Sequence, residues 1–184
     1  MLEVRALGLD GLIELHPRRF ADDRGFFSET WNAARLADAG IGVDFVQDNH
    51  SLSRAAGTLR GLHFQAPPSA QAKLVRVSRG SAFDVAVDLR PGSPTYRQWQ
   101  GVTLSAVAWN QLLIPVGFAH GFLTLEPDTE VQYKASAPYD PAADRAIRFD
   151  DPAIAIEWPL PAADFILSDR DRSAPLLANV DTGF

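Results

Sequence analysis

Three segments of the chain carry side chains that could act together on a proton. His63 and Lys73 lie in TLRGLHFQAPPSAQAK, His120 lies in GFAHGF and Tyr133 lies in VQYK. An imidazole can remove a proton, an ammonium can stabilise an oxyanion and a phenol can return a proton. These residue types predict removal of a proton beside a ketone and its replacement at the same carbon.

Short strands must position these side chains. Apolar and polar residues alternate over 83–89, 74–77, 112–114, 122–125 and 154–158. The 13 glycines and 13 prolines are scattered at short intervals, as expected of turns between strands. Strands without long intervening helices predict an all-β fold of antiparallel sheets, as a sandwich, a barrel or a jelly roll.

Two short helical segments are predicted within this β-rich pattern. The first is 33–39, with Asn32 as its N-cap and Gly40 just past its end. The second is a helical turn near 168–174.

Composition limits the classes of function. With 46% hydrophobic and 22% charged residues, the chain of 184 residues is expected to form one globular domain, 1–184. A net charge of −6 argues against nucleic acid as a partner, and no apolar run is long enough to span a membrane. The chain has no cysteine, and MLEVRALGLDGLIEL does not resemble a signal peptide. A cytoplasmic location is therefore expected.

Lysine is scarce in this chain. Lys73 and Lys134 are the two lysines among 17 basic residues. A compact ammonium whose pKa can move suits a catalytic role that arginine would fill badly. Genomic base composition explains the arginine excess equally well, so this observation is a hint only.

Each candidate also has a purely structural interpretation. Strand parity places His63 on the face of Gly61, which leaves space for a ligand, but a core histidine satisfied by hydrogen bonds is the alternative. His16 is left unassigned, and a structural or supporting role is favoured for His50. Tyr133 could be packing with its hydroxyl hydrogen-bonded, and the charge run SDRDR, which contains Asp171, would ordinarily be solvated surface or a helix cap.

A metal centre is the first rival explanation for the histidines. Jelly-roll metal sites usually use a His-x-His pair, a carboxylate a few residues later and a distant third histidine. Gln65 stands where the second ligand of His63-Phe64-Gln65 would be, and no carboxylate follows nearby. The ligands at suitable spacing are too few, so no metal is predicted.

Several blocks, in order, together resemble the dTDP-4-dehydrorhamnose 3,5-epimerase family. They are FADDRGFFSETW, FVQDNHS, LRGLHFQ, AKLVRV, FDVAVDLR, SPTYRQW, LIPVGFAHGFLTL, YKASAPY, AIEWP and LSDRDRSAPLL, from about Phe20 to Leu177. The resemblance implies a jelly-roll barrel of the cupin type, a homodimer and catalysis without a metal or organic cofactor. It also implies epimerisation at C3 and C5 of dTDP-4-keto-6-deoxyglucose, giving dTDP-4-keto-rhamnose.

The same resemblance implies roles for four residues in catalysis. His63 matches the general base, and Asp171 matches the carboxylate that orients it. Lys73 matches the cation beside the C4 oxygen of the sugar. Tyr133 matches the acid that delivers a proton from the opposite face of the ring.

The remaining matches concern substrate binding. Residues matching those that hold the nucleotide, some of them from the partner subunit, are Arg24, Glu29, Gln47, Asp48 and Asn49. Arg60, His120 and Arg170 would contact the pyrophosphate and sugar, and Tyr139 would stack on thymine. An Arg24–Glu29 surface pair and loop packing of Tyr139 are the plainer alternatives. Asp144 and Arg170 depart from the glutamate and lysine common in the family, which leaves nucleotide preference open.

Two further questions remain open at this level. Arg60 and His63 would face opposite sides of an ideal strand, so either Gly61 marks a bulge or Arg60 serves a neighbouring subunit's site. A relative that inverts only C3 or only C5 would share His63, Lys73 and Tyr133. A non-catalytic cupin that binds sugar nucleotides, or a metal-dependent cupin, is a further alternative.

Overall fold

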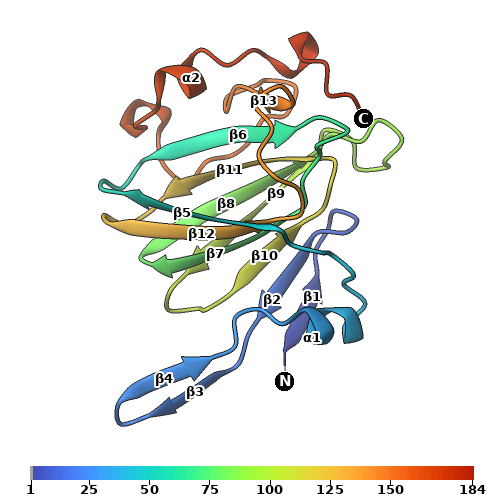
Figure 1. Cartoon of the computed structure of the whole chain (residues 1–184). Coiled ribbons are helices and arrows are strands. Elements are labelled where there is room, and N and C mark those ends of the chain that lie inside the picture. The colour runs from blue at the N-terminus through green and yellow to red at the C-terminus, as the bar shows by residue number, and fades with distance from the viewer. Residues whose placement is uncertain (1) are drawn as a thin grey trace.

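The computed structural model describes residues 2–184 as two antiparallel sheets that face each other (Figure 1). The six-stranded sheet has the order β1 (Glu3–Ala6), β2 (Ile13–His16), β10 (Gln111–Ile114), β7 (Lys73–Arg79), β12 (Thr129–Ala135) and β5 (Gln47–Ser53). The five-stranded sheet has the order β13 (Asp144–Ala146), β6 (Leu59–Gln65), β11 (Phe118–Thr124), β8 (Ser81–Asp88) and β9 (Trp99–Ser105). The predicted all-β, antiparallel architecture is confirmed.

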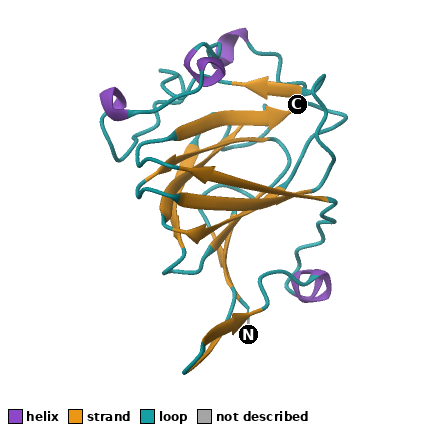
Figure 2. Ribbon diagram, turned by 60° about the vertical axis from the view of Figure 1, so that its left-hand side comes forward, coloured by secondary structure: helices purple, strands orange, loops and turns teal. Residues whose placement is uncertain are grey.

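The main core lies between the two sheets. Val75 and Val77 of β7 pack there against Ala82 and Ala86 of β8. A second core lies on the outer face of β8, where Val85 and its neighbours are covered by the C-terminal part of the chain (Figure 2). Strand β8 is therefore buried on both faces, so the polar side chains that alternate along it are not exposed.

Both predicted helical segments are present. Helix α1 (Ala33–Asp38) begins after Asn32, whose side-chain oxygen accepts a hydrogen bond from the N–H of Arg35 at 3.2 Å. Gly40 follows its end with φ +81°. Helix α2 (Asp169–Arg172) is capped by Ser168. Two 3₁₀ turns, η1 (Ala162–Asp164) and η2 (Leu177–Asn179), lie in the C-terminal part.

The strand predicted over 154–158 is wrong. The backbone N–H groups of Ile154 and Ala155 bond to the carbonyl oxygen of Asp151, and Ala155 has φ +55°, so the chain turns here. Ile154 packs in the outer core and Trp158 packs against it. The alternation reflects the insertion of side chains into that core, because the segment has no neighbouring strand in the described chain.

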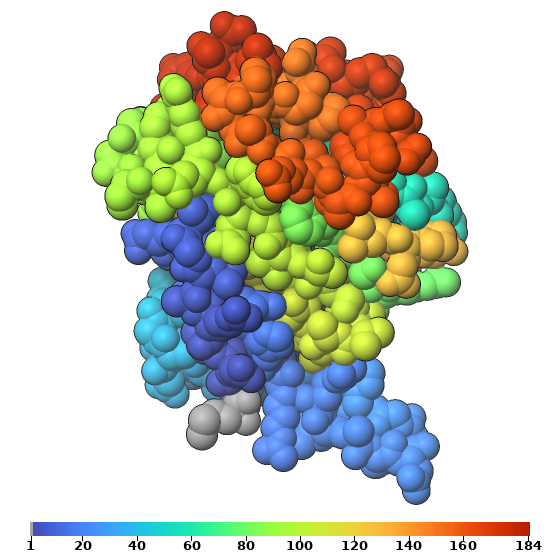
Figure 3. Space-filling model, turned by 180° about the vertical axis from the view of Figure 1, so that it is seen from behind, coloured from blue at the N-terminus to red at the C-terminus, as the bar shows by residue number. Residues whose placement is uncertain are grey.

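The hairpin of β3 (Arg19–Asp22) and β4 (Gly25–Ser28) projects from the barrel (Figures 1 and 3). Phe20, Phe26 and Phe27 are 49%, 51% and 70% exposed. The base of the hairpin is anchored by Trp109, whose indole N–H donates to the Ser28 hydroxyl at 2.9 Å. The hairpin thus presents apolar surface that its own chain does not cover. Within residues 2–184, no helix has the length and apolar character needed to cross a membrane.

Candidate active site

Strands β6 and β11 approach each other closely at a pair of glycines. His63 lies opposite His120 in the register, but Arg60 pairs with Phe122, so the register shifts between them. Gly61 has φ +122°, and a Cβ there would lie 2.6 Å from the Cα of Gly121. The irregularity brings Arg60 and His63 to one cavity despite their three-residue spacing. Of the two alternatives left by the sequence, the structure has the bulge.

That cavity, of about 520 Å³, opens between the two sheets. His63, Lys73, His120 and Tyr133 reach it from β6, β7, β11 and β12. The other predicted site residues that line it are Arg60, Tyr139, Asp144, Arg170 and Asp171. The structure therefore gathers all four predicted catalytic residues around one space.

His63 is held by a buried carboxylate. Its Nε2 lies 2.6 Å from Oδ1 of Asp171, and the other oxygen of that carboxylate accepts a hydrogen bond from the Ser168 hydroxyl at 2.8 Å. Burial raises the pKa of the Asp171 carboxyl, but the hydrogen bond and charge of His63 outweigh it and hold the pKa below its ordinary value. An ionised carboxylate only accepts hydrogen bonds, so Nε2 carries the proton and Nδ1 is the basic nitrogen of neutral His63.

His120 is held in a similar way but is more deeply buried. Its Nε2 lies 3.0 Å from both carboxylate oxygens of Asp84. Burial lowers the pKa of His120 against the opposing charge of Asp84, which favours the neutral ring. No fully buried side-chain nitrogen or oxygen lacks a partner in the described chain. The unpaired Nδ1 of His120 must therefore retain access to the cavity.

Lys73 presents an ammonium to the same space. Its side chain is buried, and burial lowers its pKa to about 8, with Asp84 and Asp144 opposing that shift. Nζ lies 5.7 Å from the centroid of the Tyr133 ring. A cation here, near a ligand oxygen, would stabilise negative charge that develops on that oxygen.

Tyr133 supplies a phenol with a strongly held proton. The side chain is partly buried, and burial raises the pKa of the phenol, reinforced by Asp144 and opposed by Arg60. The hydroxyl is thus an acid that keeps its proton at neutral pH and can give it to a carbanion nearby.

One end of the cavity is formed by a polar cluster around an exposed aromatic ring. Tyr139 is 57% exposed, and its hydroxyl donates to Asp144 at 3.1 Å. The same carboxylate oxygen lies 2.8 Å from a guanidinium nitrogen of Arg170. The N–H of Tyr139 donates to Oε1 of Gln47 at 2.8 Å. The exposed ring could stack on a planar base, and the guanidinium of Arg170 could bind an anionic group such as a phosphate.

Some predicted binding residues lie elsewhere on the chain. Arg24 pairs with Asp22 at the tip of the hairpin, and Glu29 pairs with Arg35 at 3.1 Å. Neither lines the cavity within this chain. Gln47 and Asn49 hydrogen-bond to each other on the face of β5 that Ser51 shares, and neither of them lines the cavity.

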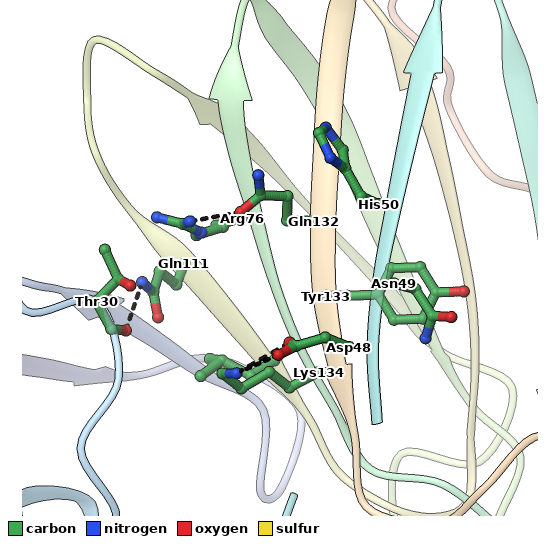
Figure 4. Close-up of a pocket in the computed structure, with 10 residues that line it drawn as sticks. Thr30, Asp48, Asn49, His50, Arg76, Gln111, Gln132, Tyr133 and Lys134 are labelled. Carbon is green, nitrogen blue, oxygen red and sulfur yellow. Dashed lines mark hydrogen bonds and ion pairs between the residues drawn. The ribbon is translucent and has the colours of Figure 1, made fainter. Parts of the chain in front are cut away.

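Asp48 faces the opposite side of β5, where a second hollow of about 320 Å³ lies on the outer face of the six-stranded sheet. Its groups are largely paired with one another: Lys134 with Asp48 at 2.9 Å, and Arg76 with Gln132 (Figure 4). Tyr133 projects to the other side of the strands. His50 also lines this hollow, but its Nε2 lies 3.1 Å from an oxygen of Glu130 and its side chain is 53% exposed, unlike the more buried histidines of the larger cavity.

Donor groups for a metal do not converge in the described chain. Within residues 2–184, no group of three or more His, Cys, Asp or Glu side chains is placed to hold an ion. Gln65, at the position where a second ligand was considered, directs its amide to backbone atoms instead. Catalysis without metal or cofactor stays a prediction.

Three residues of the site were missed at the sequence level. Asp84 alternates with apolar residues on β8, which is typical of a solvent-facing side chain. Ser168 was recognised as the start of a helical turn but not as a partner of Asp171. Gln65 was noticed only as a missing metal ligand. One signal could have indicated that Asp84 is buried. Small residues, Ala82 and Ala86, lie two positions before it and two after it, as expected in a crowded interior.

Comparison with known proteins gives a consistent result. The family model described as dTDP-4-dehydrorhamnose 3,5-epimerase matches residues 6–179. The chain is 50% identical to the dTDP-4-dehydrorhamnose 3,5-epimerase of Sinorhizobium fredii, over 92% of this chain and 87% of that relative. It is 40% identical to a dTDP-4-dehydrorhamnose 3-epimerase of Streptomyces niveus, over 96% and 84%.

Solved structures of such enzymes superimpose on the chain. The Bacillus anthracis 3,5-epimerase with TDP and PPi bound is 48% identical, with a TM-score of 0.93, covering 96% of this chain and 100% of that one. The Legionella pneumophila enzyme in complex with dTDP-4-keto-L-rhamnose is 43% identical, with a TM-score of 0.94, covering 98% and 95%. These matches confirm the predicted jelly-roll fold.

Proposed function

We propose, because this chain belongs to the dTDP-4-dehydrorhamnose 3,5-epimerase family, that His63, Lys73 and Tyr133 carry out its epimerisation. The enzyme is an isomerase that inverts C3 and C5 of dTDP-4-keto-6-deoxyglucose to give dTDP-4-keto-rhamnose. The observation that supports these roles best is the 2.6 Å contact between His63 and Asp171 in a cavity shared with Lys73 and Tyr133.

The chemistry needs a base, a cation and an acid. Nδ1 of His63 removes the proton from the carbon beside the C4 ketone, and the electron pair moves onto the C4 oxygen to form an enolate. Lys73 stabilises that oxygen more in the transition state than in the ground state. Tyr133 then donates its phenolic proton to the opposite face of the carbon, and solvent restores both groups. The sequence repeats at the second carbon.

The polar end of the cavity would hold the nucleotide diphosphate. Tyr139 offers an exposed ring for thymine to stack on, and Arg60, His120 and Arg170 line the path to the sugar. The similar Bacillus anthracis and Legionella pneumophila structures contain TDP and dTDP-4-keto-L-rhamnose. An acidic protein can therefore bind an anionic substrate through locally clustered arginines.

We propose further that the enzyme is a homodimer with a shared site. Arg24 and Glu29 lie outside the cavity of their own chain, on or beside the projecting hairpin. The exposed phenylalanines of that hairpin would be covered by a second copy. The hairpin would then bring Arg24 and Glu29 to the nucleotide end of the partner's cavity.

Proton NMR of the substrate incubated with the enzyme in D₂O tests the reaction directly. We expect deuterium at both C3 and C5, with a product of inverted configuration at both carbons. His63→Ala and Asp171→Asn should abolish or severely slow the exchange while nucleotide binding is largely retained.

The same experiment separates the two alternatives. Deuterium at one carbon only would indicate a single-centre epimerase like that of Streptomyces niveus, which the chain matches at 40% identity against 50% for the 3,5-epimerase. Nucleotide binding without any exchange, unchanged by His63→Ala, would indicate a non-catalytic binding protein.

A further inference from the structure

Gln65 makes an unusual set of contacts for a residue beside the catalytic histidine. It lies two positions after His63 on β6, and only 4% of it is exposed. Nε2 donates to the carbonyl oxygens of Ser69 at 2.6 Å and Pro138 at 3.2 Å, and Oε1 accepts from the N–H of Asp140 at 2.8 Å. Both amide donors are used, so Gln65 has none left for a ligand.

These contacts flank the residue that carries the exposed ring. Residues 136–143 connect β12 to β13 without regular secondary structure, so no sheet ladder fixes them. Gln65 bonds to the residue before Tyr139 and to the residue after it. Gln47 accepts from the N–H of Tyr139, and the Ser69 hydroxyl donates to Asp140 at 2.7 Å. Gln71 also donates to the carbonyl oxygen of Ala137 at 2.7 Å. Of these four side-chain anchors, Gln65 is the buried one.

We propose that Gln65 is a positioning residue that holds residues 136–143 so that the Tyr139 ring is ready for a nucleobase before the ligand binds. The identity of that ligand rests on the proposed function. A segment ordered in advance saves the ligand the entropy of ordering it, which increases affinity. Loss of the amide would leave two carbonyl groups and one N–H without partners and would loosen the segment. The base, the ammonium and the phenol reach the cavity from other positions, so the chemical step is spared.

A double-mutant cycle on dTDP binding tests this role. By calorimetry, Gln65→Met and Tyr139→Ala are each expected to raise the Kd for dTDP about tenfold. Because both act through one ring, the double variant should bind about as weakly as Tyr139→Ala alone rather than a hundredfold more weakly than the native enzyme. Gln65→Met should raise KM by a similar factor and leave kcat within about threefold. Binding of inorganic pyrophosphate, which has no base, should be unchanged.

Gln100→Met is the matched control. Gln100, on β9, also accepts a hydrogen bond from a backbone N–H, that of Gly8 at 3.1 Å, but lies outside the cavity. It should leave Kd and KM unchanged. Additive effects of Gln65→Met and Tyr139→Ala, or an unchanged Kd in Gln65→Met, would overturn the proposal.

Gln65→Glu provides a second variant if Gln65→Met does not fold. It keeps the size of the side chain and the acceptor for Asp140 but sets a carboxylate against two carbonyl groups, so it should also raise the Kd for dTDP. A native-like Kd in Gln65→Glu would count against the role. Absence of deuterium exchange in the native enzyme would overturn the proposed function but leave the result of the dTDP cycle intact.

Discussion

The two imidazoles of the cavity are oriented alike but differ in access to water. Each gives Nε2 to a buried carboxylate, His63 to Asp171 and His120 to Asp84. The side chain of His63 is 30% exposed and that of His120 is 6% exposed. A general base must release the abstracted proton to solvent after each cycle. The more exposed His63 is therefore better suited to be the base than His120. The neutral, enclosed ring of His120 is better suited to hold a ligand by a hydrogen bond.

Replacement of Tyr133 by Phe should separate proton removal from inversion. His63 and Lys73 still form the enolate, so deuterium from D₂O should enter the substrate. Without the phenolic proton, formation of inverted product should fall at least about a hundredfold. Parallel NMR measurements of exchange and of product provide the readout, and full epimerase activity in the variant would refute the assignment of Tyr133 as the acid.

Asp84→Asn should change the pH dependence of turnover. In the proposed mechanism Lys73 acts as an ammonium, so native activity should fall as the pH rises through about 8, the pKa of Lys73. Asp84 opposes the effect of burial on this pKa, as does Asp144 across the cavity. Loss of the Asp84 charge should therefore move the basic limb of the kcat/KM profile, which reports groups of the free enzyme, down by about one pH unit.

The control for this shift is activity at lower pH. Lys73 faces His63, His120 and Tyr133 as well as the two carboxylates. If Asp84→Asn acts through the charge on Lys73, activity should recover when the pH is lowered below the pKa of Lys73 in the variant. Equal loss of activity at every pH would point to misplacement of His120 instead.

The chemical roles of single residues were easier to predict than the residues that hold them in position. His63, Lys73 and Tyr133 stand out because their side chains can transfer or stabilise a proton, whatever the backbone does. Asp84 could not be recognised because a strand covered on both faces buries side chains of either parity. The partners of Gln65 lie in two loops whose paths no local pattern reveals.

At the scale of elements, the close approach of β6 and β11 sets the shape of the cavity. A methyl group at Gly61 would lie 2.8 Å from the carbonyl oxygen of His120, and the positive φ adds backbone strain. Gly61→Ala is therefore expected to lower the free energy of unfolding by about 2 kcal/mol or more and to impair turnover. Thermal and denaturant unfolding would measure the loss.

Gly42→Ala is the matched control for that substitution. Nothing lies within 4 Å of a Cβ built at Gly42. It should leave both stability and turnover near native values. Equal stability of the two variants would show that the register shift in β6 tolerates a side chain.

Elements with local signals were predicted better than those defined by distant packing. Helix α1 follows from Asn32 and Gly40, which act within one turn of its ends. The segment 154–158 has the alternation of a strand. Its apolar side chains instead pack on the outer face of the five-stranded sheet, and its backbone does not pair with a strand in the described part of the chain. Only the tertiary arrangement shows that no strand edge is available to it.

At the scale of the whole molecule, the projecting hairpin predicts complementation between inactive subunits. In a mixed dimer of His63→Ala and Arg24→Ala chains, a shared site would leave one of the two cavities fully native. Equal mixing after dissociation should then restore about one quarter of the native activity. Ultracentrifugation would verify that dimers form.

The outcome differs clearly if Arg24 serves its own chain. Every cavity of a mixed dimer would then lack either the base or the arginine, and mixing would give only the average of the two variants. Combining both substitutions in one chain and mixing it with native enzyme provides the control for subunit exchange.

The scarcity of lysine makes the enzyme open to selective chemical labelling. At pH 7.5 an amine with a pKa of about 8 is unprotonated in about one quarter of molecules, against about one in a thousand for an ordinary lysine. Lys134, the other lysine, is bound by both carboxylate oxygens of Asp48 at 2.9 Å. Of the two lysines, a small electrophile such as cyanate should therefore carbamoylate Lys73 before Lys134, and peptide mapping would measure the fraction of cavities that contain an accessible Lys73.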